Sequence, residues 1–551
     1  MKKNTQKIVI GVIALLLVAL YYYIELPPIN IHAPGFWKFI IVLFLIATLV
    51  YGATHVNNFK LAVQDGYRGL KRAGFKEKKN VKVFKIMAGS TIAVIVIFIV
   101  GNLASSKMFN ADRYQKLLTI ETRDFANDIK EVSYNEIPLL DRDSAEIIGT
   151  RVMGTMVDMV SQFEVADYYT QINYRNKPYR VTPLRYGSII KWITNNGDGI
   201  PAYIKIDMTT QKAECVRLEQ GIKYSTSDHF DRNIYRHLRF NYPTYIFDEI
   251  SFEIDENGTP YWVCPVKKYN IGLFGGVTIG RVVLCNAITG ECTDYDITEA
   301  PEWIDKVYSA ELLIELYDYN GLLKNGFLNS ILSQKGCLQT TDGYNYIALD
   351  DDVWVYTGIT SVGQDNSNVG FVLMNQRTAE TRYYEVAGAE EYSAMSSAEG
   401  KVQHLGYKST FPLVLNIEGQ PTYFMALKDS AGLVKQYAML NIEKYQTVAT
   451  GDTVAACEKE YINILKENGI ISGTPTKEES GTKTVKGTIT KMAQLVVEGN
   501  SHFYVQLDGK DTLYDVNFAQ VPLILTVDIG DEVTFTYSEG ENFNYVTKIA
   551  K

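Results

Sequence analysis

The chain has 551 residues, of which 46% are hydrophobic and 21% are charged. This length exceeds one ordinary domain, and the apolar content excludes a largely disordered chain. Residues 1–104 carry 13 Lys and Arg against 3 Asp and Glu, a net charge of +10, whereas the remainder carries 41 basic and 60 acidic residues, a net charge of −19. Because so acidic a region repels nucleic acid, we expect no nucleic-acid partner.

Three apolar runs open the chain, at residues 8–24, 36–51 and 84–103. Each approaches the ~20 residues that a helix needs to cross a bilayer. No small-residue cleavage site follows the first run, which continues with Glu25, so we expect it to be retained rather than removed as a signal peptide. Residues 1–104 are therefore predicted to form a three-helix transmembrane anchor in the lipid bilayer.

The distribution of basic residues predicts how this anchor is oriented. Lys and Arg are more frequent on the cytoplasmic side of membrane helices. The stretch between the first two runs has no Lys or Arg before Lys38, which places it outside and both the N-terminus and the loop 54–85 in the cytoplasm. The large C-terminal region is then extracytoplasmic. The basic residues that define the inner side are Lys2, Lys3, Lys7, Lys60, Arg68, Lys71, Arg72, Lys76, Lys78, Lys79, Lys82 and Lys85.

The acidic region after the anchor is predicted to have an α+β fold. Residues 105–142 begin with a polar helical stretch, which we interpret as a stalk. Residues 143–163 place apolar side chains at three-to-four spacing, as a helix packed on a sheet does. Strand patterns with helical stretches between them then predict α+β units over 143–300 and further α+β units over 301–470.

Two short patterns recur in this region. A Gly-x-Pro-x-aromatic pattern, typical of a turn that enters a strand, occurs three times, and residues 343–346 resemble a degenerate copy. We expect its glycines, Gly199, Gly258 and Gly419, at equivalent turns of similar sheets.

The second pattern is Asn/Asp-x-x-Thr, at residues 207–210, 286–289 and 375–378. Its clearest copy predicts a β-hairpin in which Asn286 bonds its own turn and Gly290 takes the left-handed conformation that forms a bulge.

The hairpin at 286–291 and the pairing of single helices with antiparallel sheets resemble the PepSY or cystatin-like family, in pieces over about residues 120–450. That resemblance implies repeated units of one helix and one curved antiparallel sheet. It also implies an extracytoplasmic, non-catalytic role in inhibition or protein contacts. The whole outer region is similar to uncharacterised membrane-anchored proteins of Gram-positive bacteria, which supply no established chemistry.

A polar segment and a set of alternating strands end the chain. Residues 471–484 are polar and contain Gly473, Pro475 and Gly481, which predicts a linker. About five short strands follow in 485–551, which resembles a small OB-like β-barrel. Because this barrel has few basic residues and is expected outside the cell, we interpret it as a contact module.

Six cysteines are too sparse for a disulfide framework, and none has the spacing of a zinc ribbon. Cys285 and Cys292 flank the predicted turn, so a bridge is possible only where they lie directly opposite each other. A register shifted by one residue separates them and leaves two free thiols. The remaining cysteines are Cys215, Cys264, Cys337 and Cys457.

No motif in the sequence assigns a catalytic, cofactor-binding or metal-binding residue. Ser188 and Lys191 match the SxxK pattern of serine acyl-transferases without its partner motifs. The run 350–352 holds three aspartates but not the spacing of a calcium loop. The histidines are scattered and form no metal-binding helix: His229, His237, His404 and His502.

These observations favour a non-enzymatic, membrane-anchored protein of the bacterial cell envelope that binds or modulates another envelope protein. Two alternatives stay open. One is an enzyme, or an enzyme subunit, that acts on envelope polymers. The other is a sensor that passes an outer signal through the helices to the basic loop.

Overall fold

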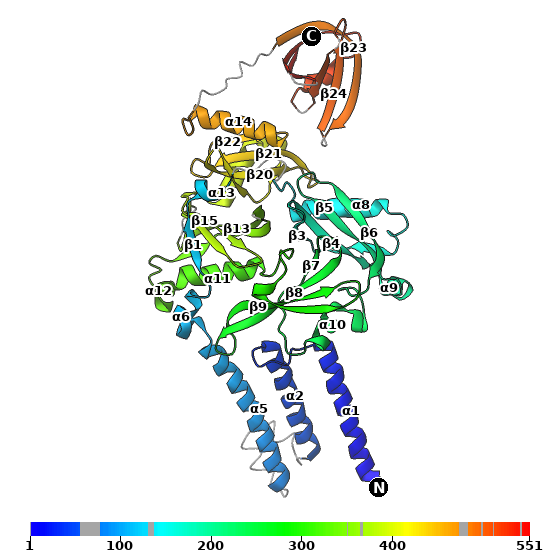
Figure 1. Ribbon diagram of the computed structural model, residues 1–551, viewed down its shortest axis with the longest axis vertical. Coiled ribbons are helices and arrows are strands. Elements are labelled where there is room, and N and C mark those ends of the chain that lie inside the picture. The colour runs from blue at the N-terminus through cyan, green and yellow to red at the C-terminus, as the bar shows by residue number, and fades with distance from the viewer. Residues whose placement is uncertain are drawn as a thin grey trace. The chain divides into compact units, whose positions relative to one another are not determined.

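A computed structural model describes residues 2–55, 78–130, 137–349, 351–363, 367–472, 483–497, 500–510, 512–518, 520–539 and 543–550. The fold is mixed α+β, as expected, with a closed five-stranded barrel near the C-terminus (Figure 1). The chain divides into two compact units. Unit 1 comprises Met1–Thr122, Ala145–Asp365 and Val372–Tyr383, and unit 2 comprises Arg123–Ser144, Asn366–Phe371 and Tyr384–Lys551.

Three apolar helices begin unit 1: α1 (Lys2–Glu25), α2 (Pro34–His55) and α5 (Lys78–Ala104). Within the described residues, two helical segments are long and apolar enough to cross a membrane, Pro34–Gly52 and Lys82–Ala104. The remaining predicted span, residues 8–24, corresponds to Gly11–Glu25 in α1, an apolar segment shorter than the ~20 residues that a span needs. Most of the predicted basic loop, residues 56–77, lies outside the described residues.

The expected helical stalk at 105–142 is instead a series of short elements packed on the sheets. The sequence argument missed the packing of Tyr114, which is buried with Ile271 and Leu323 and so fixes the first helix after the anchor against the fold. The elements are α6 (Lys107–Gln115), β1 (Ile120–Arg123), α7 (Phe125–Asp128) and the first residues of α8 (Arg142–Thr155).

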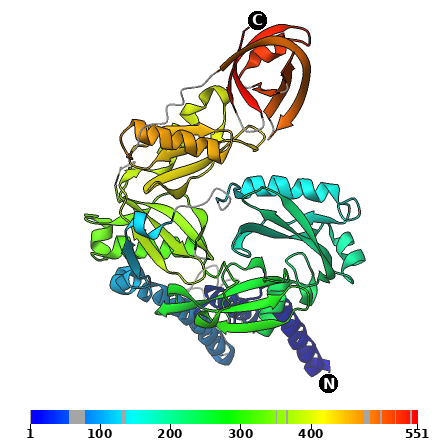
Figure 2. The same ribbon diagram turned by 45° about the horizontal axis from the view of Figure 1, so that its top comes forward.

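Two antiparallel sheets occupy the region predicted as 143–300. The first sheet has the order β2-β4-β5-β6 with β3 also on β4, and α8 lies across one face of it (Figure 2). The second sheet has the order β10-β9-β8-β7. Their strands are β2 (Phe163–Val165), β3 (Thr170–Asn173), β4 (Pro178–Tyr186), β5 (Ile200–Asp207), β6 (Ala213–Ile222), β7 (Ser251–Ile254), β8 (Pro260–Ile271), β9 (Gly275–Asn286) and β10 (Cys292–Asp296).

Two further sheets follow. The third sheet has the order β1-β16-β15-β13-β11 with β12 on β13, and all its strands except β1 follow α11 (Ala310–Leu323) and α12 (Phe327–Ile331) in the chain. The fourth sheet, order β18-β20-β21-β22 with β19 on β20, lies between α13 (Glu391–Lys401) and α14 (Val454–Glu467). Their strands are β11 (Leu338–Thr340), β12 (Asn345–Leu349), β13 (Asp352–Ser361), β15 (Gly370–Asn375), β16 (Thr381–Tyr384), β18 (Lys408–Ser409), β19 (Leu413–Ile417), β20 (Gln420–Lys428), β21 (Val434–Asn441) and β22 (Val448–Gly451).

One turn recurs between the last two strands of all four sheets. Its first residue is Asp207, Asn286, Asn375 or Asn441, and in each case the side-chain Oδ1 accepts hydrogen bonds from the backbone N–H groups two and three residues later. The sequence pattern predicted the first three. It missed the fourth because Lys444 stands where the pattern has Thr.

The Gly-x-Pro prediction is right for two copies and wrong for the third. Gly258 and Gly419 have φ of +81° and +72°, and each lies in the turn between two strands that pair with each other, β7 with β8 and β19 with β20. Gly199, with φ of +85°, instead leads from a helix into β5. The pattern specifies a left-handed backbone before a strand, but it does not specify which strand.

Two buried carboxyl groups connect the first two sheets. Glu253 on β7 accepts hydrogen bonds from the backbone N–H groups of Asp305 (2.9 Å) and Lys306 (3.0 Å), and Asp305 accepts one from the N–H of Asn173 on β3 (2.7 Å). Burial raises the pKa of both carboxyl groups, and their mutual repulsion raises that of Asp305 further. The folded protein therefore holds protons that the unfolded chain releases above about pH 4. As the pH rises, this pair accordingly lowers the free energy of unfolding of the protein.

Asp305→Asn is accordingly expected to raise the melting temperature of the detergent-solubilised protein by a few degrees at pH 8, because it removes one charge and keeps an oxygen for the Asn173 N–H. The gain should shrink as the pH falls towards about 4, because the folded protein then keeps its protons at little cost and the unfolded chain begins to bind them as well. Tryptophan fluorescence on heating measures it, with the exposed Asp342→Asn as control. A lower melting temperature at pH 8 would contradict the assignment.

The C-terminal barrel closes in the order β23-β24-β25-β27-β26, with β25 and β27 parallel. The predicted inward face is confirmed, since Val533, Phe535 and Tyr537 are 1%, 0% and 9% exposed. Its core consists entirely of residues from 489–549. The barrel strands are β23 (Lys483–Val497), β24 (Asn500–Leu507), β25 (Leu513–Asn517), β26 (Glu532–Glu539) and β27 (Asn544–Ala550).

Residues 483–551 expressed alone are expected to fold, because the barrel core draws on no residue from the four sheets. A dispersed amide NMR spectrum and a cooperative thermal transition would be the result. Phe535→Ala should lower the free energy of unfolding of this fragment by about 3–5 kcal/mol. An unfolded fragment would mean that the barrel depends on the rest of the chain. Most of the predicted linker, residues 473–482, lies outside the described residues.

Candidate thiol and imidazole site

The hairpin between β9 and β10 has the bulged turn that the sequence predicted. The N–H of Gly290 donates to the carbonyl of Asn286 (2.8 Å), and the N–H of Asn286 donates to the carbonyl of Glu291 (2.9 Å). Gly290 has a φ of +77°. These bonds fix the register of the two strands from their first pair onward.

Cys285 and Cys292 lie directly opposite each other in that register. Since the neighbouring pair, Asn286 and Glu291, is hydrogen-bonded, the cysteine pair occupies the non-hydrogen-bonded site, where Cα atoms lie closest. Both side chains therefore project from the same face of the sheet as free thiols. Cys264 on β8 lies on this face as well, opposite Val283, and is fully buried.

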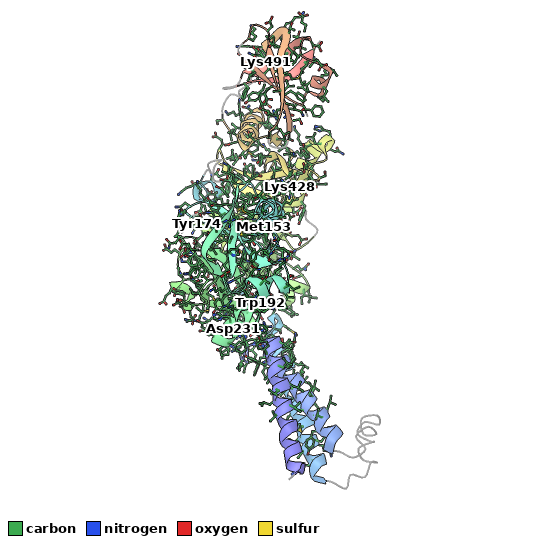
Figure 3. All side chains as sticks on the ribbon, turned by 90° about the vertical axis from the view of Figure 1, so that its right-hand side faces the viewer. Met153, Tyr174, Trp192, Asp231, Lys428 and Lys491 are labelled. Atoms are coloured by element: carbon green, nitrogen blue, oxygen red, sulfur yellow. The ribbon has the colours of Figure 1, made fainter. Side chains whose placement is uncertain are left out.

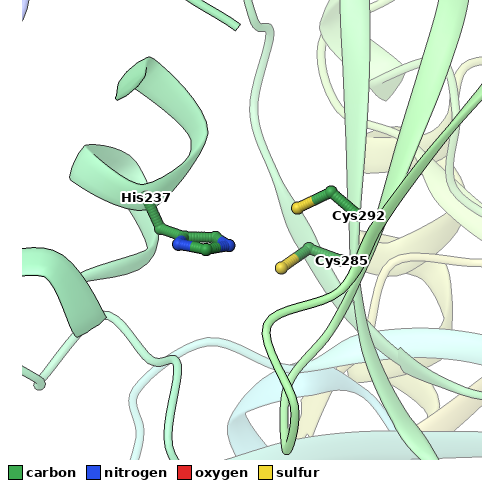
Figure 4. A group of neighbouring side chains, drawn as sticks. All are labelled: His237, Cys285 and Cys292. Atoms are coloured by element: carbon green, nitrogen blue, oxygen red, sulfur yellow. The ribbon is translucent and has the colours of Figure 1, made fainter. Parts of the chain in front are cut away.

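The third member of the site, His237, comes from α10 (Ile234–Asn241), a short helix that crosses this face. The His237 Nε2 lies 2.7 Å from the carbonyl oxygen of Gly290, and its ring packs on Tyr224 with centroids 4.4 Å apart. Because a carbonyl oxygen only accepts, Nε2 carries a proton in this arrangement. The ligand atoms of His237, Cys285 and Cys292 all lie within 4.8 Å of one another (Figure 4).

The two thiols differ in their readiness to ionise. The hydrogen bond from the Cys285 thiol, with a further contribution from His237, lowers the pKa of Cys292 to about 6. The same thiol pair and burial raise the pKa of Cys285. Burial alone would lower the pKa of His237, but hydrogen bonds to Cys292 and Gly290 raise it. These shifts favour the thiolate form of Cys292 over that of Cys285, and they favour the protonated form of the neighbouring His237 imidazole.

Such a group has two chemical capacities. A thiolate with an adjacent thiol can take part in thiol–disulfide exchange, and two thiolates with an imidazole can bind a soft metal ion. Sequence reasoning did not assemble this site, because His237 stands alone in the sequence, 48 residues before Cys285. The only signal available was the pair of cysteines that flank the turn.

The SxxK pair has a structural role. Ser188 is the N-cap of α9 (Ile189–Asn195), where its Oγ accepts a hydrogen bond from the backbone N–H of Lys191 (3.3 Å). On the same helix Trp192, labelled in Figure 3, donates from its indole to Asp228 (3.0 Å).

The other sequence candidates are also dispersed. Asp352 binds the Arg377 guanidinium, with Nε 2.6 Å from Oδ1, rather than facing an open calcium site. His229 packs edge-on against the indole of Trp192, and His502 lies 2.8 Å from Asp515 in the barrel. His404 lies in a 3-10 turn of unit 2. These residues are not brought together.

Comparisons with known proteins assign no family. No protein-family model matches the chain, and no curated protein matches it. Solved structures that match in part include a Synechocystis apocarotenoid oxygenase (9% identity, TM-score 0.17, over 55% of this chain and 64% of that one). Others are a Bacteroides thetaiotaomicron endo-1,4-beta-xylanase (10%, 0.16, 71% and 95%) and a B. megaterium levansucrase (9%, 0.17, 77% and 96%). TM-scores this low carry no argument about fold or function.

Proposed function

We propose that this chain is a multi-pass membrane protein of the bacterial cell envelope, whose extracytoplasmic region binds or modulates another envelope protein without catalysis. In this proposal α1, whose full length is 24 residues, spans the bilayer beside α2 and α5, and the N-terminus and the basic loop lie in the cytoplasm. The four sheets are duplicated PepSY-like units, for which the shared turn at Asp207, Asn286, Asn375 and Asn441 is the support.

The observation that carries the proposal is the junction between the helices and the second sheet. The tip of the β8–β9 hairpin lies at the ends of α2 and α5, where the Ser105 Oγ accepts hydrogen bonds from the N–H groups of Leu273 (2.9 Å) and Phe274 (3.1 Å). The Phe274 ring packs edge-on against Trp37 and Phe98. An anchor fixed so closely to a folded region serves to hold that region at the membrane surface.

The barrel supports a binding role. It exposes Leu495 (56%) and Ile529 (62%), which line one groove together with Met492 and Phe543 and so form a shared apolar surface. We place the partner contact there.

A second candidate function, an outer-surface sensor, is favoured by α10. This helix carries His237 towards the thiols, and on its other side the Arg239 Nε donates to the carbonyl of Leu26 at the end of α1 (2.9 Å). A ligand at the thiols therefore has a short route of contacts to the first helix.

Protease digestion of intact cells or protoplasts tests the topology. Protease added outside should remove the region after Leu103 and spare the loop 54–85, because positive residues are retained inside. Digestion of that loop from outside would refute the orientation.

A photoreactive amino acid at Leu495 tests the binding role in the native membrane. We expect a crosslink to one envelope protein, and none from the exposed Lys548 on β27 as a matched control position. Equal crosslinking at both positions, or release of soluble fragments from purified cell wall by the full chain, would argue against a non-catalytic binding protein.

A further inference from the structure

We propose that His237, Cys285 and Cys292 bind a zinc ion. Thiolate sulfur and imidazole nitrogen are the ligands that Zn²⁺ prefers in proteins. Zn–S and Zn–N distances of about 2.3 and 2.1 Å place the ligand atoms of a tetrahedral site roughly 3.5–3.8 Å apart. The three ligand atoms here lie within 4.8 Å of one another, about 1 Å beyond that spacing, and the ion would take the place of the Gly290 carbonyl that lies 2.7 Å from the His237 Nε2.

The ligands come from elements whose positions are fixed by other contacts. The bulged turn at Asn286–Gly290 sets Cys285 and Cys292 opposite each other. The helix that carries His237 is held through Arg239, which donates to the carbonyls of Leu26 (2.9 Å) and Tyr245 (2.7 Å). A site assembled from supported elements needs little reorganisation to bind its ion.

The charges of the site balance when zinc is bound. Each cysteine binds as a thiolate, so its thiol proton passes to solvent, and the proton that the His237 Nε2 now donates to the Gly290 carbonyl also passes to solvent while Nδ1 keeps one. Two thiolates and a neutral imidazole then neutralise the dication, which suits the half-buried position of Cys292. Three protein ligands leave the fourth position of zinc for water.

Metal titration of the full chain in detergent, reduced and freed of reductant, tests the proposal. We expect one Zn²⁺ per chain by elemental analysis. Titration with Co²⁺ should give the visible bands of tetrahedral cobalt and the thiolate-to-cobalt charge-transfer band, both of which Zn²⁺ should abolish. Cys285→Ser, Cys292→Ser and His237→Gln should each weaken binding more than the ~10–100-fold that the loss of an outer-shell partner costs.

Cys215→Ser is the matched control, since Cys215 is a partly exposed thiol on β6 of the first sheet, and it should bind like the wild type. Circular dichroism separates loss of zinc from loss of fold, and His237→Gln changes a different element from the two cysteine variants. The proposal is overturned when the reduced wild type binds no Zn²⁺ or Co²⁺, or when the three ligand variants bind like Cys215→Ser. A Cys285–Cys292 disulfide in the protein isolated from cells would also overturn it.

Discussion

Gly290→Ala is expected to lower the free energy of unfolding of unit 1 by about 2–4 kcal/mol. Two effects add. Gly290 has a φ of +77°, which an L side chain rarely adopts. An added methyl group would also lie 2.3–2.7 Å from three ring atoms of Tyr224, whose ring packs against His237. The ring has to move, and the imidazole moves with it.

Urea unfolding followed by tryptophan fluorescence measures the loss, and the rate of maleimide modification of Cys292 reports on the site. The matched control is Gly336→Ala. Gly336 has a φ of +66°, and a methyl group there would meet only an ordinary contact at 3.5 Å, so this variant has the backbone strain without the steric clash. An equal loss in the two variants would show that Tyr224 does not constrain the hairpin.

Arg239→Met is expected to destabilise the protein by about 2–4 kcal/mol. Arg239 is 8% exposed and donates to the backbone carbonyls of Leu26 (2.9 Å), Tyr242 (3.2 Å) and Tyr245 (2.7 Å). Methionine fills the same space but leaves the Leu26 and Tyr245 carbonyls without this donor, and each unpaired buried group costs about 1–3 kcal/mol, whereas the Tyr242 carbonyl keeps the Tyr245 N–H (3.2 Å). Burial of the Arg239 charge is unfavourable, since it lowers the pKa of the guanidinium. Removal of that charge therefore offsets part of the loss.

The comparison variant is Arg236→Met on the same helix. Arg236 lies over the Tyr23 ring with its guanidinium carbon 4.6 Å from the centroid, an interaction worth about 1 kcal/mol or less at such a site. Heating of the detergent-solubilised protein should therefore show a much larger drop in melting temperature for Arg239→Met. Similar drops for both variants would remove the special role of the Leu26 carbonyl.

Local patterns in the sequence predicted local structure well. The turn at Asn286–Gly290 follows from a short-range Asx bond and a glycine that tolerates a positive φ, so residues within six positions of each other decide it. The barrel follows from strict alternation, as at Val533, Phe535 and Tyr537. The sequence left the register of Cys285 and Cys292 uncertain by one residue, and the bulge at the turn fixes the register in which they lie directly opposite each other.

Features that depend on distant packing were not predictable from these patterns. The local sequence places Tyr114 in a polar helical stalk, because nothing near it in the chain indicates that Ile271 and Leu323 cover it. His237 is an isolated histidine in the sequence. The short helix α10 is positioned by its contacts with Leu26 and Gly290, which are distant in the sequence, rather than by its own residues. The prediction for Gly199 was wrong for the same reason, because which strands a turn connects depends on how the strands pair in the sheet.

The contacts of Ser105 with Leu273 and Phe274 have a consequence for how the helices respond to lipid. A methyl group on Gly272 would lie 2.4 Å from the Ser105 Oγ, so the hairpin tip and the end of α5 are in direct contact, while the His32 ring, just before α2, holds the Leu273 carbonyl at 2.8 Å. In bilayers of different thickness, helices usually adjust by independent tilting. The beginning of α2 and the end of α5 are both bound to the same hairpin tip, so in a bilayer the two helices would tilt together and the second sheet would rotate with them.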